Sequence, residues 1–208
     1  MQYKKAAPET VSVAVPSVTG ANIVPQAVGG SPAFYSWKPS TWPTHTKFTP
    51  AFLETLEQIF YESMLGEIAN VIADIKKSNG DLQHRGHVVA ISLMCALDAI
   101  SSYPYRKHNM SKFVVAHFPA AYKPHANALY RLYRNSTIHS WNLFEAGIAP
   151  GTETITKGQN GTLVFGLEDF FQALNTGVED FLKKLEADVP LQKNTLNRYN
   201  KLRKTAKP

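Results

Sequence analysis

Two side chains with complementary chemistry lie five residues apart in the segment RNSTIH, residues 134–139. His139 can transfer protons near neutral pH, because the ordinary pKa of histidine is about 6.5. Arg134 stays charged and can donate two parallel hydrogen bonds to a phosphate group. An imidazole and a guanidinium together supply the proton transfer and charge stabilisation that RNA cleavage by its own 2′-hydroxyl requires. This chemistry needs no metal ion and no cofactor, and we expect neither.

The spacing of this pair constrains how it can act. On a straight helix, five residues rotate by about 140° and rise about 7.5 Å, so the two side chains would flank a face without stacking on it. A helix break near Asn135, a residue that favours caps, would bring them together. Asn135 would then hold a backbone group or a phosphate oxygen. The alternative is structural, with the pair capping a helix or bonding a carboxylate such as Asp98.

Basic residues gather in two segments of the chain. Residues 99–144 contain six Lys and Arg and no Asp or Glu, and residues 191–208 contain six more, again with no acid. Such segments favour anionic partners, although a solvated helix face has the same composition. Tyrosines among basic residues can stack on bases or fill a core. The RNA-contacting residues that we predict are Lys112, Lys123, Arg131 and Tyr130. Three further histidines would line the same cleft or serve as ordinary packing side chains: His108, His117 and His125.

Apolar periodicity predicts a mainly α-helical fold of about five helices. Thr49-Pro50 has the N-cap and first-turn proline of a helix start, and that helix should end near Gly80. Further helices are expected over 81–101, 111–117, from Pro124 through an interruption near residue 135 to about 144, and 167–187, ending at Pro190. A small β-hairpin is expected at 150–166, with strands at 152–156 and 162–165.

The composition divides the chain into three parts. Residues 1–47 are rich in Pro and Ala and predict an extended or disordered arm. Residues 48–190 form the helical domain, and residues 191–208 form a basic C-terminal tail with at most a short helix. If the chain is a non-catalytic binding module, removal of this tail should weaken its binding to nucleic acid or an acidic protein with little effect on melting.

The quoted motif and its surroundings resemble the HEPN superfamily. The resemblance covers about residues 50–187 and lies in LYRLYRNSTIHS, in LMCALDAISSYPY upstream, and in FVVAHFP between them. It implies an up-and-down helical bundle in which Arg134 and His139 are the paired catalytic residues and Asn135 is the polar residue after the arginine. In such proteins two protomers pack motif against motif and form a shared RNA-cleaving cleft. The hairpin and the N-terminal arm depart from the family's minimal bundle.

The resemblance implies a metal-independent endoribonuclease acting as a homodimer. Many relatives in that superfamily belong to toxin–antitoxin or antiviral defence systems, and some have lost catalysis and serve as dimerisation, RNA-binding or protein-binding modules. The alternative expectation for this chain is such a non-catalytic module. The single cysteine, Cys95, excludes an intramolecular disulfide and a Cys-based zinc site. No apolar run reaches the ~18–20 residues of a membrane span, and no signal peptide is evident, so we expect a cytoplasmic protein without a membrane partner.

Overall fold

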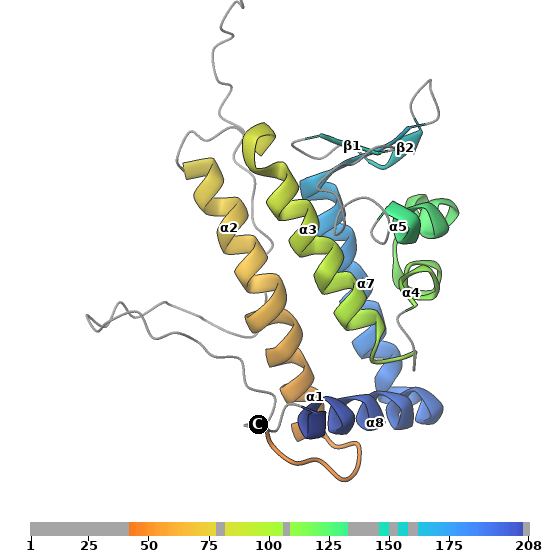
Figure 1. Ribbon diagram of the computed structural model, residues 1–208. Coiled ribbons are helices and arrows are strands. Elements are labelled where there is room, and N and C mark those ends of the chain that lie inside the picture. The colour runs from red at the N-terminus through yellow and green to blue at the C-terminus, as the bar shows by residue number, and fades with distance from the viewer. Residues whose placement is uncertain are drawn as a thin grey trace, which may run out of the picture. The chain divides into compact units, whose positions relative to one another are not determined.

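The computed structural model is mainly helical, as the sequence predicts, and it describes residues 42–77, 82–105, 109–132, 146–149, 154–157 and 162–205 (Figure 1). All of them belong to one unit, Lys38–Pro208. The N-terminal arm up to residue 41 lies outside the described residues, as do the predicted helix ends at residues 78–81.

The first long helix has three consecutive parts: α1 (Pro50–Glu57), the π-helical segment η2 (Gln58–Leu65) and α2 (Gly66–Lys77). Its predicted start is confirmed, because the Thr49 hydroxyl accepts a hydrogen bond from the Phe52 backbone N–H at 3.2 Å. The π segment was not predicted. It ends where the Gly66 N–H bonds the Tyr61 carbonyl, and a Cβ at Gly66 would lie 2.7 Å from that oxygen. A glycine is therefore required at this position.

Helix α3 (Leu82–Ser101) occupies the centre of the bundle. It packs against α2 and α7 (Leu167–Ala187), and Figure 1 shows it between them. Its buried side chains include Val89, Leu93 and Leu97. A helix that contacts neighbours on several sides must be apolar around most of its surface, which explains the nearly continuous apolar sequence.

A helical corner packs beside α3 and α7. Helix α4 (Met110–His117) matches the predicted short helix, and it is followed by the 3-10 segment η3 (Ala120–His125) and by α5 (Ala126–Leu132). The predicted helix start at Pro124 is wrong, since Pro124 lies inside η3 and the α-helix begins at Ala126. The Ser111 hydroxyl donates to the Ala126 carbonyl at 3.1 Å and joins α4 to α5.

Three short strands form a sheet with the order β1-β3-β2. Strand β3 (Leu163–Gly166) pairs antiparallel with β2 (Thr156–Lys157), which confirms the antiparallel pairing of the predicted hairpin. The predicted bounds of its first strand, 152–156, are wrong, since residues 154–155 are not in a strand and β2 includes Lys157. Strand β3 also pairs in parallel with β1 (Ala146–Ala149), which the sequence did not predict. The β1 sequence, AGIA, has neither alternation nor β-branched enrichment beyond one isoleucine, so its pairing depends on β3.

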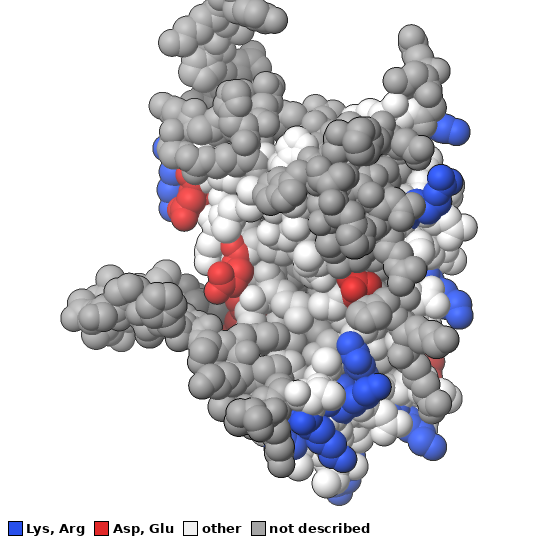
Figure 2. Space-filling model, viewed as in Figure 1, with Lys and Arg blue, Asp and Glu red and all other residues white. Residues whose placement is uncertain are grey.

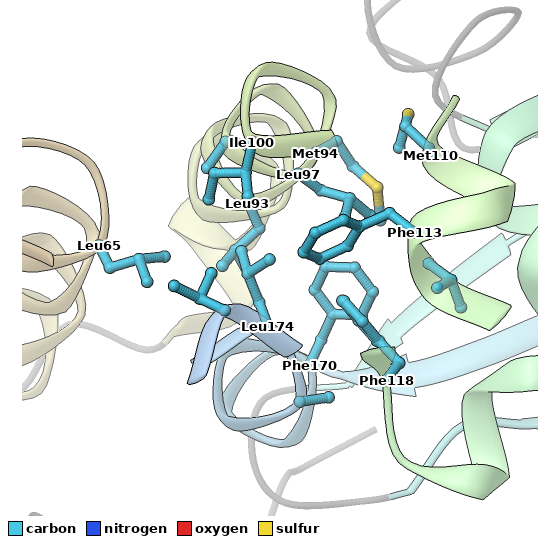
Figure 3. Close-up of a cluster of buried hydrophobic side chains, with 14 of the residues drawn as sticks. Leu65, Leu93, Met94, Leu97, Ile100, Met110, Phe113, Phe118, Phe170 and Leu174 are labelled. Atoms are coloured by element: carbon cyan, nitrogen blue, oxygen red, sulfur yellow. The ribbon is translucent and has the colours of Figure 1, made fainter. Parts of the chain in front are cut away.

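The last two helices complete the core. The predicted bounds of α7 are confirmed, and its buried face carries Phe170, Leu174 and Phe181. Figure 3 shows Phe170 and Leu174 of α7 among Phe113, Phe118 and the α3 side chains Leu93 and Leu97. The close approach of α4 and α7 requires Gly177, because a Cβ there would lie 2.8 Å from the Phe118 ring.

The segment that the sequence suggests is a basic tail forms helix α8 (Val189–Thr205), 17 residues long. Pro190 does not end α7, which stops at Ala187. It lies in the first turn of α8, where no backbone donor is needed. The Asp188 carboxylate accepts from the Leu191 N–H at 2.9 Å and caps this turn. Tyr199 and Thr195 of α8 are fully buried, so this helix belongs to the domain core.

Candidate nucleic-acid interface

Helix α8 carries positive charge without any compensating acid. Residues 189–205 include no Asp or Glu, and five cationic side chains project from the helix: Lys193, Arg198, Lys201, Arg203 and Lys204. Among the described residues, none of these five forms an ion pair with a carboxylate. Figure 2 shows Lys and Arg side chains gathered where α8 lies, whereas acidic side chains gather over the first long helix. This surface therefore attracts anions.

The exposed side of α8 presents an ordered row of polar groups, which we call the basic stripe: Lys193, Asn197, Lys201 and Lys204. All four are exposed, and their spacing of four, four and three residues places them on one helix face. The eleven residue steps from Lys193 to Lys204 rise about 16.5 Å along the helix. Because Thr195 and Tyr199 fix the opposite side in the core, the stripe has to face outward.

A segment from the beginning of the described chain runs along α8, and we call it the strap, residues 42–48. The Trp42 ring stacks on Tyr199 with centroids 5.3 Å apart. The Tyr199 hydroxyl donates to the Pro43 carbonyl at 2.7 Å, and the Asn200 side-chain amide donates to the His45 carbonyl at 2.9 Å. These contacts fix the strap backbone against the second half of α8.

A pocket of about 610 Å³ lies between the strap and the last turns of α8, and we call it the strap pocket. Three strap residues and six helix residues line it: Thr44, His45, Thr46, Asn197, Asn200, Lys201, Arg203, Lys204 and Thr205. No carboxylate is among them. Cationic groups, amides and hydroxyls in one place are the donors that hold phosphate groups in proteins.

The positive charge of the strap pocket comes from its Lys and Arg side chains and not from His45. The Thr55 hydroxyl donates to the Ala51 carbonyl at 2.9 Å, so its oxygen accepts from His45 Nε2 at 3.0 Å. Burial, and secondarily the nearby Arg203 guanidinium, lower the pKa of His45 below its ordinary value of 6.5. His45 is therefore neutral at pH 7 and acts as a fixed support for the strap.

Comparison with known proteins gives no indication of function, so the function has to be inferred from the contacts described above. No family model, curated protein or solved structure matches the chain. The HEPN resemblance therefore depends on the sequence segments that carry it.

The predicted catalytic residues Arg134, Asn135 and His139 lie outside the described residues, between α5 and β1. Whether the guanidinium and the imidazole meet is a prediction that the structure does not test. Among the described residues, no group of three or more His, Cys, Asp or Glu side chains is arranged to hold a metal ion. Within the same residues, none of the helices has the length and apolar character that crossing a membrane demands.

The predicted RNA-contacting residues lie on the helical corner. Lys112, Lys123 and Arg131 are exposed on α4, η3 and α5, three elements that pack against one another. Tyr130 is half-buried and packs against the core, as in the packing alternative for the tyrosines. Neither the basic stripe nor the strap pocket was predicted from the sequence. The spacing of Lys193, Lys201 and Lys204 was a signal for the stripe, but nothing local indicated the strap.

His117, one of the three additional histidines, has a structural role. Its Nδ1 lies 2.7 Å from an Asp180 carboxylate oxygen, and the Lys184 amine lies 2.6 Å from the same oxygen. Lys184 also donates to the Ala116 carbonyl at 3.0 Å. The imidazole is buried and contacts the rings of Phe113 and Phe181. This arrangement links α4 to α7 inside the core.

The His117–Asp180 pair should make the fold less stable in mild acid. Burial lowers the pKa of His117 and outweighs the raising effect of its bond to Asp180. Burial alone would raise the pKa of Asp180, but hydrogen bonds from Lys184 and His117 lower it. Both groups bind protons more readily in the unfolded chain, so stability is present above pH 6.5 and is lost progressively as the pH falls below it.

We therefore expect a lower melting temperature at pH 5 than at pH 7.5, measured by circular dichroism. His117→Gln should reduce this difference, whereas His87→Gln, at an exposed position on α3, should leave it as in the wild type. An equal loss of stability in wild type and His117→Gln would show that other groups cause the pH dependence.

Proposed function

We propose that this helical domain binds RNA through the basic stripe and the adjoining strap pocket of α8. The observation that carries the proposal is a 17-residue helix with no acidic residue. One face of this helix belongs to the core, and the exposed face carries lysines that pair with no carboxylate among the described residues. Lysines on a row of about 16.5 Å can contact several successive phosphates of a strand. Asn197, in the same row, offers an amide for sugar or phosphate oxygens.

The chemistry of α8 favours a nucleic acid over a lipid surface. A helix that binds a membrane lays its apolar face into the lipid. Tyr199 is buried in the core, and Leu191, Leu196 and Leu202 pack against it. Val189, in the first turn, is the one large apolar side chain that α8 exposes, and the stripe itself has no apolar member. RNA is the favoured nucleic acid because the segment at 134–139 resembles the motif of RNA-cleaving HEPN proteins.

The salt dependence of binding tests the proposal. We expect the logarithm of the association constant for a fluorescent 12-nucleotide RNA to fall linearly with the logarithm of salt concentration, by about 0.7 per phosphate contact. Three lysine contacts give a slope of about −2 or steeper. No binding at 50 mM salt, or tighter binding to poly-glutamate than to RNA, would contradict the proposal.

A second candidate function is metal-independent endoribonuclease activity at a homodimeric cleft, with His139 as general acid or base and Arg134 stabilising the phosphorane. The sequence RNSTIH favours it, and a phosphate-binding helix on the same chain would hold the substrate. A dimerising or binding module without catalysis is the alternative, with a role in defence or toxin–antitoxin systems.

Incubation of the purified protein with mixed RNA in EDTA distinguishes these functions. The nuclease should cleave RNA without a divalent metal, and His139→Ala should leave the RNA intact. His87→Ala, at an exposed position on α3, is the matched control and should retain cleavage. If wild-type protein leaves RNA intact while it sediments as a dimer, the non-catalytic module is supported. A monomer would argue against a shared cleft.

A further inference from the structure

The strap pocket differs from the rest of the basic stripe in its charge density. Lys201, Arg203 and Lys204 lie within one helical turn and all line it, whereas Lys193 is the only cation in the first half of the stripe. The volume of about 610 Å³ falls within the ~300–1,000 Å³ range of pockets that enclose small ligands.

We propose that the strap pocket binds the terminal phosphomonoester of a nucleotide, at the end of an RNA strand or on a free nucleotide. The strand-end form of this inference rests on the proposed RNA binding, and the free-nucleotide form does not. A phosphodiester inside a strand carries one negative charge, whereas a phosphomonoester carries about 1.5 to 2 at pH 7, because its second pKa is about 6. Three adjacent cations without a carboxylate match the more highly charged group.

Arg203 is the residue that points to a bound anion. Its Nε is buried and has no hydrogen-bond partner among the described residues. A buried donor without a partner destabilises a fold. Because this atom is closed to solvent, a phosphate oxygen would bond it only after the guanidinium turns toward the strap pocket, where the planar group can bond two oxygens at once.

Some neutral residues of the pocket hold its wall in place, and others can contact a ligand. The Thr205 hydroxyl donates to the Leu202 carbonyl at 3.0 Å, and the Asn200 amide donates to the His45 carbonyl, so both hold the pocket wall. Thr44, Thr46 and Asn197 contribute the other hydroxyl and amide groups of the lining, which suit a sugar or a phosphate. The partial negative charge of about 0.5 at the end of α8 is outweighed by three full positive charges.

The experiment compares RNA 8-mers of one sequence that carry a 5′-phosphate, a 3′-phosphate or only hydroxyl ends, together with AMP and adenosine. Lys204→Gln removes a cation from the strap pocket, and Lys193→Gln removes one from the stripe outside it. Both lysines are exposed on α8, so both variants should fold. We expect at least one phosphorylated RNA to bind about fivefold more tightly than the hydroxyl form at 0.1 M salt, as for one added phosphate contact.

Lys204→Gln should abolish this preference for a phosphorylated end. Lys193→Gln should weaken the binding of all three RNAs by the same factor and preserve the preference. AMP binding without adenosine binding, lost in Lys204→Gln, would extend the pocket's ligand to free nucleotides. Equal affinity for all three RNAs, with no AMP binding, would overturn the proposed phosphomonoester site and leave the proposed RNA binding intact. A preference that persists in both Lys204→Gln and Arg203→Gln would also overturn it. AMP binding without any RNA binding would support phosphomonoester binding in the strap pocket and overturn the proposed RNA-binding function.

Discussion

Replacing Lys193, Lys201 and Lys204 together by glutamine should weaken RNA binding about 100-fold at 0.1 M salt. Each contact between a lysine and a single strand contributes about 0.7 to the slope of log K on log salt, which corresponds to about fivefold in affinity at 0.1 M. The slope should therefore become less negative by about 2. Fluorescence anisotropy with a labelled RNA at several salt concentrations measures both quantities. The three side chains are exposed, so the melting temperature should stay the same.

A control with the same change in net charge separates local contacts from the overall field. Lys77, Lys157 and Lys183 are exposed on α2, β2 and α7, and their replacement by glutamine also removes three positive charges. This control should weaken binding only slightly, because charges beyond about 10 Å are screened at 0.1 M salt. Equal losses of RNA affinity in the two triple variants would mean that α8 is not the surface that contacts RNA.

Tyr199→Ala should lower the free energy of unfolding by about 3–5 kcal/mol, as for loss of a buried aromatic side chain. Tyr199 is fully buried, and its ring contacts Trp42, Phe52 and His45. Its hydroxyl also holds the Pro43 carbonyl at 2.7 Å. The substitution therefore removes the contacts that join α8 to both the core and the strap. Urea denaturation followed by circular dichroism measures the loss.

Tyr199→Phe provides the matched comparison, because it keeps the ring and removes only the hydrogen bond to Pro43. We expect it to cost about 0.5–1.5 kcal/mol. A cost below about 1 kcal/mol for Tyr199→Ala would show that α8 is not part of the core. The same contacts explain why deletion of residues 191–208 is not a clean test of binding. The deletion would remove Tyr199 and open the core, so the expected unchanged melting temperature does not follow from the structure.

Local sequence signals predicted several elements well. The Thr49-Pro50 start is confirmed by a side-chain cap, and the bounds of α7 follow from apolar residues at helical spacing. The β2–β3 hairpin follows from two short strands around a glycine-rich turn. These features depend only on residues close together in the sequence, and capping and periodicity rules use only such residues.

Other elements could not be predicted because distant partners stabilise them. Strand β1 has a weak strand sequence and exists through its parallel pairing with β3. Helix α8 has few apolar residues, so its composition resembles that of a solvated tail. The residues that meet the core, Leu191, Thr195, Tyr199 and Leu202, recur at helical spacing. Most residues between them are polar or basic, so the composition favoured a solvated tail over a core helix.

By itself, the sequence determined the helical class, the start of the first helix, the bounds of α3, α4 and α7 to within a residue, the acid-free basic segments and the Arg134–His139 pair as a candidate for RNA chemistry. Only the tertiary structure decided that the last basic segment is a core helix with a lysine stripe outside and a pocket at its end. The physical reason is separation along the chain. The hydrogen bonds that form the pocket, Tyr199 to Pro43 and Asn200 to His45, join residues more than 150 positions apart, and no local pattern encodes such contacts.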